Sequence, residues 1–172
     1  MTDYPSRNHY HTTWIDNAEA LHLAIELGPK DSNIFSVKRN QTINYMSTHP
    51  LSYAALKSDS STKYLKTIKE DEQKISREIY YIPTSALNKS KEVLNCIHDG
   101  DILSMVTSKA GLDVSHLGIA KWGKDGKLHL LNASSLHKKV VIEPRTLYQY
   151  QQSQKSQIGI RVVRLTQTTN TH

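Results

Sequence analysis

The longest regular pattern of apolar and polar positions lies between residues 61 and 81. Apolar side chains recur there at the spacing of one helical face, at Tyr64, Leu65, Ile68, Ile75 and Ile79. Lysine, glutamate and aspartate fill most of the remaining positions. The pattern predicts one amphipathic helix over 61–81, which Pro83 would end because proline cannot continue a helix.

From residue 101 onward the pattern changes to short apolar runs separated by turn residues. It predicts strands at 101–107, 116–122, 128–133, 138–142 and 158–165. The joins are short, and Lys124-Asp125-Gly126 is typical of a hairpin. Consecutive strands with tight turns favour a curved antiparallel sheet of about five strands with helices packed on it, so the predicted class is α+β.

The stretch before residue 98 has weaker patterns. We expect short helices over 18–27 and 85–97, short strands at 35–37 and 42–46, helical turns over 51–56, and a last short helix over 145–152. A length of 172 residues is enough to bury a core. We therefore expect a single domain over 1–172, with an irregular and helical part (1–98) and an antiparallel sheet part (99–165).

Composition narrows the function classes. The chain is basic, with a net charge of +6, but its lysines and arginines are scattered, which favours a solvated surface over a nucleic-acid footprint. No apolar run is long enough to span a membrane, and the first five residues lack the basic and apolar segments of a signal peptide. A single cysteine excludes an internal disulfide framework and a cysteine-based metal site.

Candidate chemistry centres on His116 and Asn132. His116 begins one predicted strand and Asn132 lies near the end of the next, so a hairpin closed at 124–126 would make the two side chains cross-strand neighbours. An asparagine that hydrogen-bonds a histidine ring fixes its tautomer, which is the role of the third residue in Cys-His-Asn hydrolases. The alternative is a structural histidine at a strand edge.

Two other groups of residues point less clearly to chemistry. His9 and His11, with His49 or Asp16, could be imagined as a metal site, but no ligand spacing supports it, and we expect no metal. Ser134 has no Gly-x-Ser-x-Gly elbow around it, so we expect it to line a cleft and not to act as a nucleophile.

Several motifs, in order along nearly the whole chain, resemble one family. They are S-R-N-H-Y-H-T-T-W-I-D-N (6–17), I-N-Y-M-S-T-H-P-L-S-Y-A-A-L (43–56), Y-Y-I-P (80–83), D-G-D-I-L (99–103), G-L-D-V-S-H-L-G-I-A (111–120), L-L-N-A-S-S (130–135) and G-I-R-V-V-R-L (159–165). Together they resemble the N-acetylmuramoyl-L-alanine amidase-like family, a branch of the papain-like NlpC superfamily of cell-wall hydrolases.

The resemblance implies roles for particular residues. His116 would be the catalytic histidine, and Asn132 would occupy the third catalytic position, where the family more often has histidine. Arg7, Tyr10 and Trp14 would line the substrate side, and Ser134, expected above to line a cleft, would be a further substrate-binding residue. The implied ligand is a muropeptide or peptidoglycan fragment, no cofactor is implied, and the implied location is the cell envelope or periplasm.

The nucleophile departs from the family pattern. The family's cysteine stands at the start of a helix that precedes everything seen here, whereas the only cysteine, Cys96, lies near the end of the predicted 85–97 helix. We expect Cys96 to be a small, partly buried apolar residue. The resemblance then covers the C-terminal part of such an enzyme without its nucleophile helix, and a sheet face that this helix would cover is expected to be exposed.

Three explanations remain open for this departure: a fragment, a nucleophile on a separate polypeptide, or a degenerate relative. Three hypotheses of function follow. The first is an amidase of cysteine-hydrolase type that is incomplete in this chain and inactive alone. The second is a non-catalytic muropeptide-binding module, and the third is a basic nucleic-acid-binding domain.

Overall fold

The computed structural model describes residues 4–57 and 61–166. Its strands form one sheet: β1 (Ala24–Glu26), β2 (Val37–Gln41), β3 (Arg77–Pro83), β4 (Ile102–Thr107), β5 (Val114–Trp122), β6 (Leu128–Ser134), β7 (Lys139–Ile142) and β8 (Gln157–Leu165). Their order is β2-β3-β8-β4-β5-β6-β7, all neighbours are antiparallel, and β1 pairs with β8. The described part of the chain is thus an open, eight-stranded α+β fold.

The helices are short, apart from two. The α-helices are α1 (His11–Ala20), α2 (Tyr45–Thr48), α3 (Ser61–Ile75) and α4 (Leu147–Gln152). The 3-10 helices are η1 (Tyr4–Ser6), η2 (Pro50–Ser52), η3 (Ala54–Leu56) and η4 (Thr84–Asn88). No helix in the described ranges is long and apolar enough to cross a membrane.

All five predicted strands are present as β4 to β8, but a sheet of about five strands was an underestimate. The three additional strands, β1, β2 and β3, come from residues 1–98, which we expected to be mainly irregular and helical. The short strand expected at 35–37 overlaps β2 only at Val37. Two of the three additional strands, β1 and β2, are too short to show a clear alternation. They are strands because β1 pairs with β8 and β2 pairs with β3, and these partners lie far away in sequence.

The predicted 61–81 helix was too long. The helix α3 ends at Ile75, and β3 begins at Arg77. Within β3, buried Ile79 and Tyr81 alternate with exposed Glu78 and Tyr80, which is the two-residue period of a strand. Ile75 and Ile79 are four residues apart, so the strand's first buried residue also fits the helical spacing.

Other boundaries also differ from the predictions. The helix expected at 18–27 is α1, which begins and ends earlier, and its expected second half contains β1. The segment 85–97 has one 3-10 helix followed by turns, and 42–46 contains the start of α2 instead of a strand. The helical turns at 51–56 and the last helix, α4, are confirmed.

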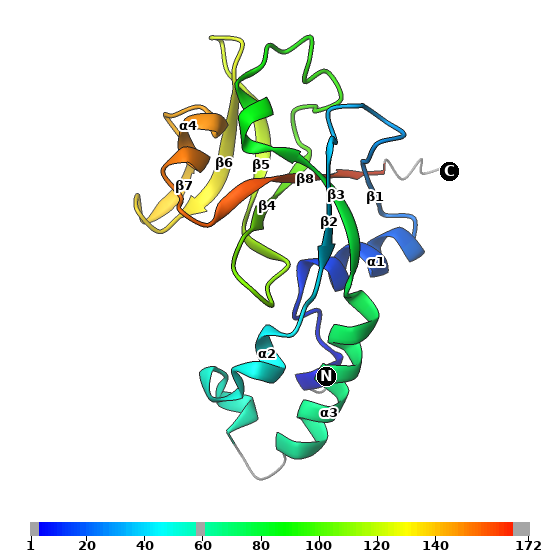
Figure 1. Cartoon of the computed structure of the whole chain (residues 1–172). Coiled ribbons are helices and arrows are strands. Elements are labelled where there is room, and N and C mark those ends of the chain that lie inside the picture. The colour runs from blue at the N-terminus through cyan, green and yellow to red at the C-terminus, as the bar shows by residue number, and fades with distance from the viewer. Residues whose placement is uncertain (1–3, 58–60, 167–172) are drawn as a thin grey trace, which may run out of the picture.

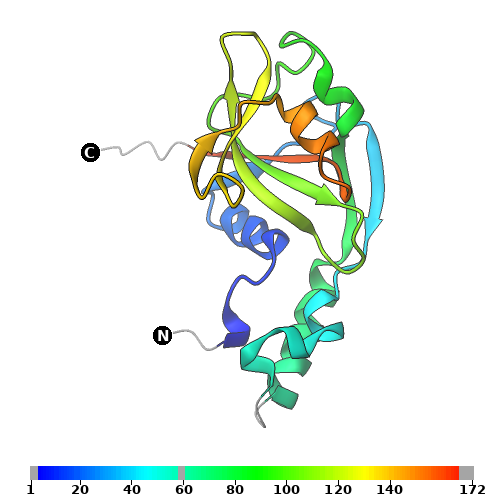
Figure 2. The same ribbon diagram turned by 90° about the vertical axis from the view of Figure 1, so that its left-hand side faces the viewer.

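The sheet has a helix-covered core on each side. Figures 1 and 2 show α1 and α4 on opposite sides of β8. Under α1, Ile15 and Ala18 pack against Val163 of β8. The larger core lies on the α4 side, where the fully buried residues include Leu94, Leu103, Met105, Leu130, Leu147, Ile160 and Val162.

The helices α2 and α3 project together from one end of the sheet (Figures 1 and 2). They share a small core in which Met46 and Leu56 pack with Ile68 of α3. Tyr10, just before α1, is part of the same core. This contact ties the projecting lobe to the start of α1, where a cavity of about 570 Å³ lies.

Part of the sheet carries apolar side chains that are exposed. Leu117 and Ile119 of β5 and Val140 and Ile142 of β7 are 40–70% exposed. Ile119 pairs with Leu131 of β6, which pairs in turn with Ile142, so these side chains form a continuous row across three strands. We call Leu117, Ile119, Val140 and Ile142 the apolar row. An exposed sheet face of this kind was expected from the sequence.

Candidate functional site

The predicted neighbours His116 and Asn132 are in contact. The Nε2 atom of His116 lies 3.0 Å from Oδ1 of Asn132. The contact joins β5 to β6, whose pairing begins at Trp122 and Leu128 beside the predicted turn. Gly118 allows this packing, because a Cβ atom there would stand 2.4 Å from Cδ1 of Leu130. The glycine thus makes room for a core leucine of the neighbouring strand.

A buried carboxylate fixes the orientation of the Asn132 amide. The Nδ2 group of Asn132 donates to Oε1 of Glu143 at 3.2 Å, and the two residues are 5% and 2% exposed. Only the NH₂ end of an amide can donate to a carboxylate, so Oδ1 must face His116 and accept from Nε2–H. In the neutral ring of His116, Nδ1 is then the nitrogen without a proton and is able to accept one.

Glu143 was not predicted as a site residue. It directly follows the last strand residue of β7, Ile142, and its second carboxylate oxygen lies 3.7 Å from Nε2 of His137. A single glutamate before a proline does not predict a buried side chain, because glutamate is among the residues least often buried. Its pairing with Asn132 is a property of the folded sheet.

His116 stands between two cavities. The larger, about 570 Å³, lies beside the start of α1 and is lined by residues from α1, α2, β4 and β5, among them Tyr10, His11, Trp14, Asp113 and His116. The smaller, about 280 Å³, is lined by His116, Asn132, Ser134, Glu143, Arg145 and Tyr150, among others. A group bound in either cavity could therefore approach the His116 ring.

The structure brings most of the expected substrate-side residues to these cavities. Tyr10 and Trp14 line the larger cavity together with His116, and Ser134 lines the smaller one. Arg7 lines neither of the two. It is exposed, and its guanidinium carbon lies 5.8 Å from the centre of the Tyr4 ring.

Tyr10 is held as a fixed, neutral part of the cavity wall. Its hydroxyl donates to Oε1 of Glu72 at 2.6 Å and accepts from the backbone N–H of Met46 at 2.9 Å. Burial, followed by the hydrogen bond to Glu72, raises the pKa of the Tyr10 hydroxyl far above its usual range. The side chain therefore offers the cavity a ring face and not a titrating group.

Cys96 is not placed to serve His116. The side chain is partly buried against the larger core and lines neither cavity. Burial raises the pKa of its thiol, which opposes formation of the nucleophilic thiolate.

The histidines of the imagined metal site make separate contacts. The Nε2 atom of His9 bonds the Tyr4 carbonyl at 2.7 Å, and His49 stacks on Tyr45. In the part of the chain that the structure describes, no group of three or more His, Cys, Asp or Glu side chains is placed to hold a metal ion.

Comparison with known proteins places this α+β fold in a family. The model of the AmiA-like family, described as N-acetylmuramoyl-L-alanine amidase-like, matches residues 1–160. The chain therefore belongs to the N-acetylmuramoyl-L-alanine amidase-like family. Comparison with curated proteins gave no match.

Solved structures are similar over nearly the whole chain. An N-acetylmuramoyl-L-alanine amidase from Bacteroides uniformis is 35% identical, with a TM-score of 0.87, over 96% of this chain and 67% of that one. A candidate xylanase from Bacteroides fragilis is 37% identical, with a TM-score of 0.83, over 95% and 68%. Protein LPG0564 of Legionella pneumophila, at 21% identity and a TM-score of 0.68 over 97% and 64%, shares the fold.

Proposed function

We propose that this chain carries the histidine–amide part of a papain-like, NlpC-type amidase that acts on peptidoglycan fragments. The bond cleaved would be the amide between the lactyl group of N-acetylmuramic acid and L-alanine. The observation that carries the proposal is the hydrogen-bonded series His116–Asn132–Glu143 at the wall between two cavities, in a chain of the amidase-like family.

The geometry fits general acid–base work by His116. With Nε2–H held by Asn132, Nδ1 takes the proton of a cysteine thiol, and the thiolate attacks the amide carbonyl carbon to form a tetrahedral intermediate. The protonated ring then returns the proton to the leaving alanine nitrogen, and the C–N bond breaks to give an acyl-enzyme. Water, deprotonated by the same Nδ1, hydrolyses the thioester and regenerates the thiol.

The cysteine in this mechanism is not Cys96, which is partly buried with a raised thiol pKa and lies at neither cavity. We propose that it comes from a polypeptide segment outside this chain that packs on the apolar row. Two observations support this. The row is exposed and includes Leu117, which directly follows His116 in β5, and this chain corresponds to 67% of the length of the Bacteroides uniformis amidase chain. The proposed setting is the cell envelope.

The residues that line the two cavities fit glycoside hydrolysis less well. This reaction ordinarily needs two carboxyl groups on either side of the scissile bond. Among the residues that line the larger cavity, Asp113 is the only acidic one, and its two oxygens accept from the backbone N–H groups of Thr12 and Val114, each at 2.8 Å. The smaller cavity likewise has one, Glu143, which is engaged with Asn132.

The second candidate function is a non-catalytic muropeptide-binding module that uses the same cavity. The raised thiol pKa of Cys96 favours it, since a binding module needs no thiolate. The two candidates differ in what happens when a nucleophile is provided: the amidase part gains turnover, and the binding module does not.

The test combines binding and turnover. We expect the chain alone to bind N-acetylmuramoyl-L-alanine in calorimetry but to release no alanine from it. Addition of the nucleophile-bearing segment of a family relative should restore release with wild-type chain and not with His116→Ala. Release by the chain alone that survives Cys96→Ala and disappears in His116→Ala would refute the proposed source of the nucleophile. Binding without release in every mixture would favour the binding module.

A further inference from the structure

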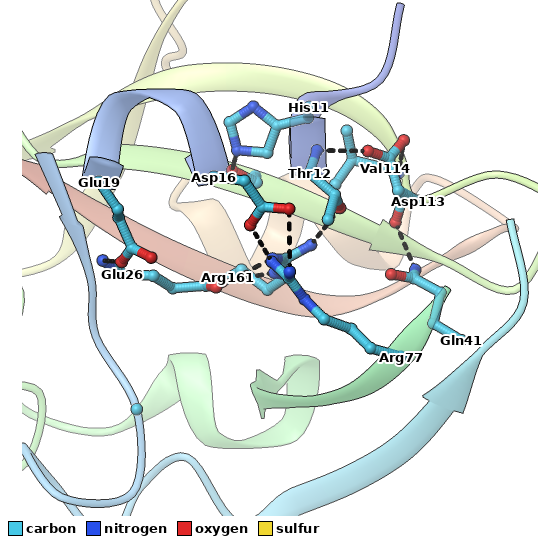
Figure 3. A network of polar contacts seen from close by, with 12 residues as sticks. His11, Thr12, Asp16, Glu19, Glu26, Gln41, Arg77, Asp113, Val114 and Arg161 are labelled. Atoms are coloured by element: carbon cyan, nitrogen blue, oxygen red, sulfur yellow. Dashed lines mark hydrogen bonds and ion pairs between the residues drawn. The ribbon is translucent and has the colours of Figure 1, made fainter. Parts of the chain in front are cut away.

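A second histidine, His11, faces the larger cavity from the first turn of α1. It is 8% exposed, lines this cavity, and stands beside the polar network drawn in Figure 3. Its ring stacks on Trp14 with an interplanar angle of 14°. The proposed acid–base steps do not use it, although it shares the cavity with His116.

The network holds the backbone around His11 rigidly. Arg161 of β8, 1% exposed, donates to both carboxylate oxygens of Glu26 and to the hydroxyl of Thr12 at 3.0 Å. The backbone N–H of Thr12 donates in turn to Asp113. The residue next to His11 is thus anchored from β8 and from the loop before β5, so the ring has a defined position.

The partner of His11 fixes its tautomer. The Nε2 atom lies 2.5 Å from the hydroxyl of Ser104 on β4, which is fully buried. Among the described residues, that hydroxyl makes its one hydrogen bond to Nε2. A buried hydroxyl that accepted from Nε2–H would leave its own proton without an acceptor, which is costly. Ser104 therefore donates to Nε2, and the proton of the neutral ring resides on Nδ1.

The Nδ1 atom points away from the network in Figure 3, and no hydrogen bond of the described residues uses it. Burial, followed by the charge of Arg161, lowers the pKa of His11 to about 4, so the ring is neutral at pH 7. His11 thus offers one N–H group from a fixed position on the cavity wall.

We propose that Nδ1–H of His11 donates a hydrogen bond to a carbonyl oxygen of the ligand in the larger cavity, as a binding residue distinct from His116. The inference rests on the proposed function, because it takes this cavity as the muropeptide site. A neutral donor suits an amide carbonyl. The buried hydroxyl of Ser104 acts through His11 as a positioning group.

The first test needs no variant. Long-range ¹H–¹⁵N spectra of the wild-type chain at pH 7 report the tautomer of each histidine, and we expect His11 with its proton on Nδ1. Addition of N-acetylmuramoyl-L-alanine should shift the His11 Nδ1 resonance. A proton on Nε2, or an Nδ1 resonance that stays unchanged when the ligand saturates the chain, overturns the inference.

The second test uses two matched variants, both with Ser104→Ala so that no hydroxyl is left unpaired. His11→Phe removes the donor but keeps the ring, whereas His11→Asn places an amide near the position of Nδ1. We expect His11→Phe/Ser104→Ala to bind N-acetylmuramoyl-L-alanine about 3- to 10-fold more weakly, and His11→Asn/Ser104→Ala to recover most of the affinity. His98→Ala, an exposed histidine that lines neither of the two cavities, is the control.

Failure of this inference and failure of the proposed function give different results. If the wild-type chain binds the ligand and both His11 variants bind it equally well, the role of His11 is refuted while the function stands. If the wild-type chain does not bind the ligand at all, the proposed function is refuted and the inferred ligand contact with it.

Discussion

Acidification from pH 7 to pH 5 should destabilise the fold through His11. Its imidazole titrates near 6.5 in the unfolded chain and at about 4 in the folded one, because burial and then Arg161 disfavour the charged ring more than Asp113 and Glu26 favour it. Between these values the unfolded chain binds a proton that the folded chain does not. The stability contribution of the neutral ring is therefore present above pH 6.5 and lost as the pH falls towards 4. At pH 5 the loss amounts to about 2 kcal/mol, and below pH 4 to about 3 kcal/mol.

Urea unfolding at pH 7, 6 and 5 measures this loss. Other groups also titrate over this range, so the quantity to compare is the difference between the wild-type chain and His11→Phe/Ser104→Ala, in which the titrating ring is absent and the Ser104 hydroxyl is not orphaned. We expect the free energy of unfolding of the wild-type chain to fall by about 2 kcal/mol more than that of the variant. Parallel pH profiles for the two proteins would refute the burial and the neutral state of His11.

Two further predictions concern the site and the sheet. Glu143→Leu should leave the buried Nδ2 group of Asn132 unpaired and lower the free energy of unfolding in urea by about 1–3 kcal/mol. Glu143→Gln keeps an acceptor and should lower it less. Histidine ¹⁵N spectra should show a mixed tautomer for His116 in the leucine variant only. The double variant Ile119→Thr/Ile142→Thr should change the free energy of unfolding by less than about 1 kcal/mol, because both side chains are at least 40% exposed. It should also reduce self-association in sedimentation. A large loss of stability would show that the apolar row is buried in the protein.

The sheet could be predicted where its pairing is local. Strands β4 to β8 each follow their predicted ranges closely, since apolar runs between turn residues mark them. Three pairs of successive strands, β4–β5, β5–β6 and β6–β7, are antiparallel neighbours. The strands that were missed depend on distant partners: β3 pairs with β2 and β8. The alternation of buried Ile79 and Tyr81 with exposed residues covers only a few positions. It directly follows α3, and Ile79 lies four residues after Ile75, so Ile79 also fits the helical spacing.

The site could be predicted where two residues share a hairpin. His116 and Asn132 lie on strands joined by a short turn, so their contact followed from the turn position alone. His11 and Glu143 could not be found in this way. His11 and Ser104 are 93 residues apart in sequence, so no local pattern predicts their contact. The spacing of His11 two residues after His9 is not a signal of function. Glu143 is an acidic residue whose burial depends on the packing of β7 on β6.

The asparagine at the third catalytic position depends on Glu143, which fixes the orientation of its amide. An amide can present either its oxygen or its NH₂ group to a histidine, and only the oxygen leaves Nδ1 of His116 free to accept a proton. Glu143 removes the choice, since its buried carboxylate accepts from the NH₂ end. An imidazole in this place would also need a defined tautomer. The carboxylate therefore supplies the orientation that an amide lacks by itself, and with it Asn132 is a sufficient partner for His116 in the proposed chemistry.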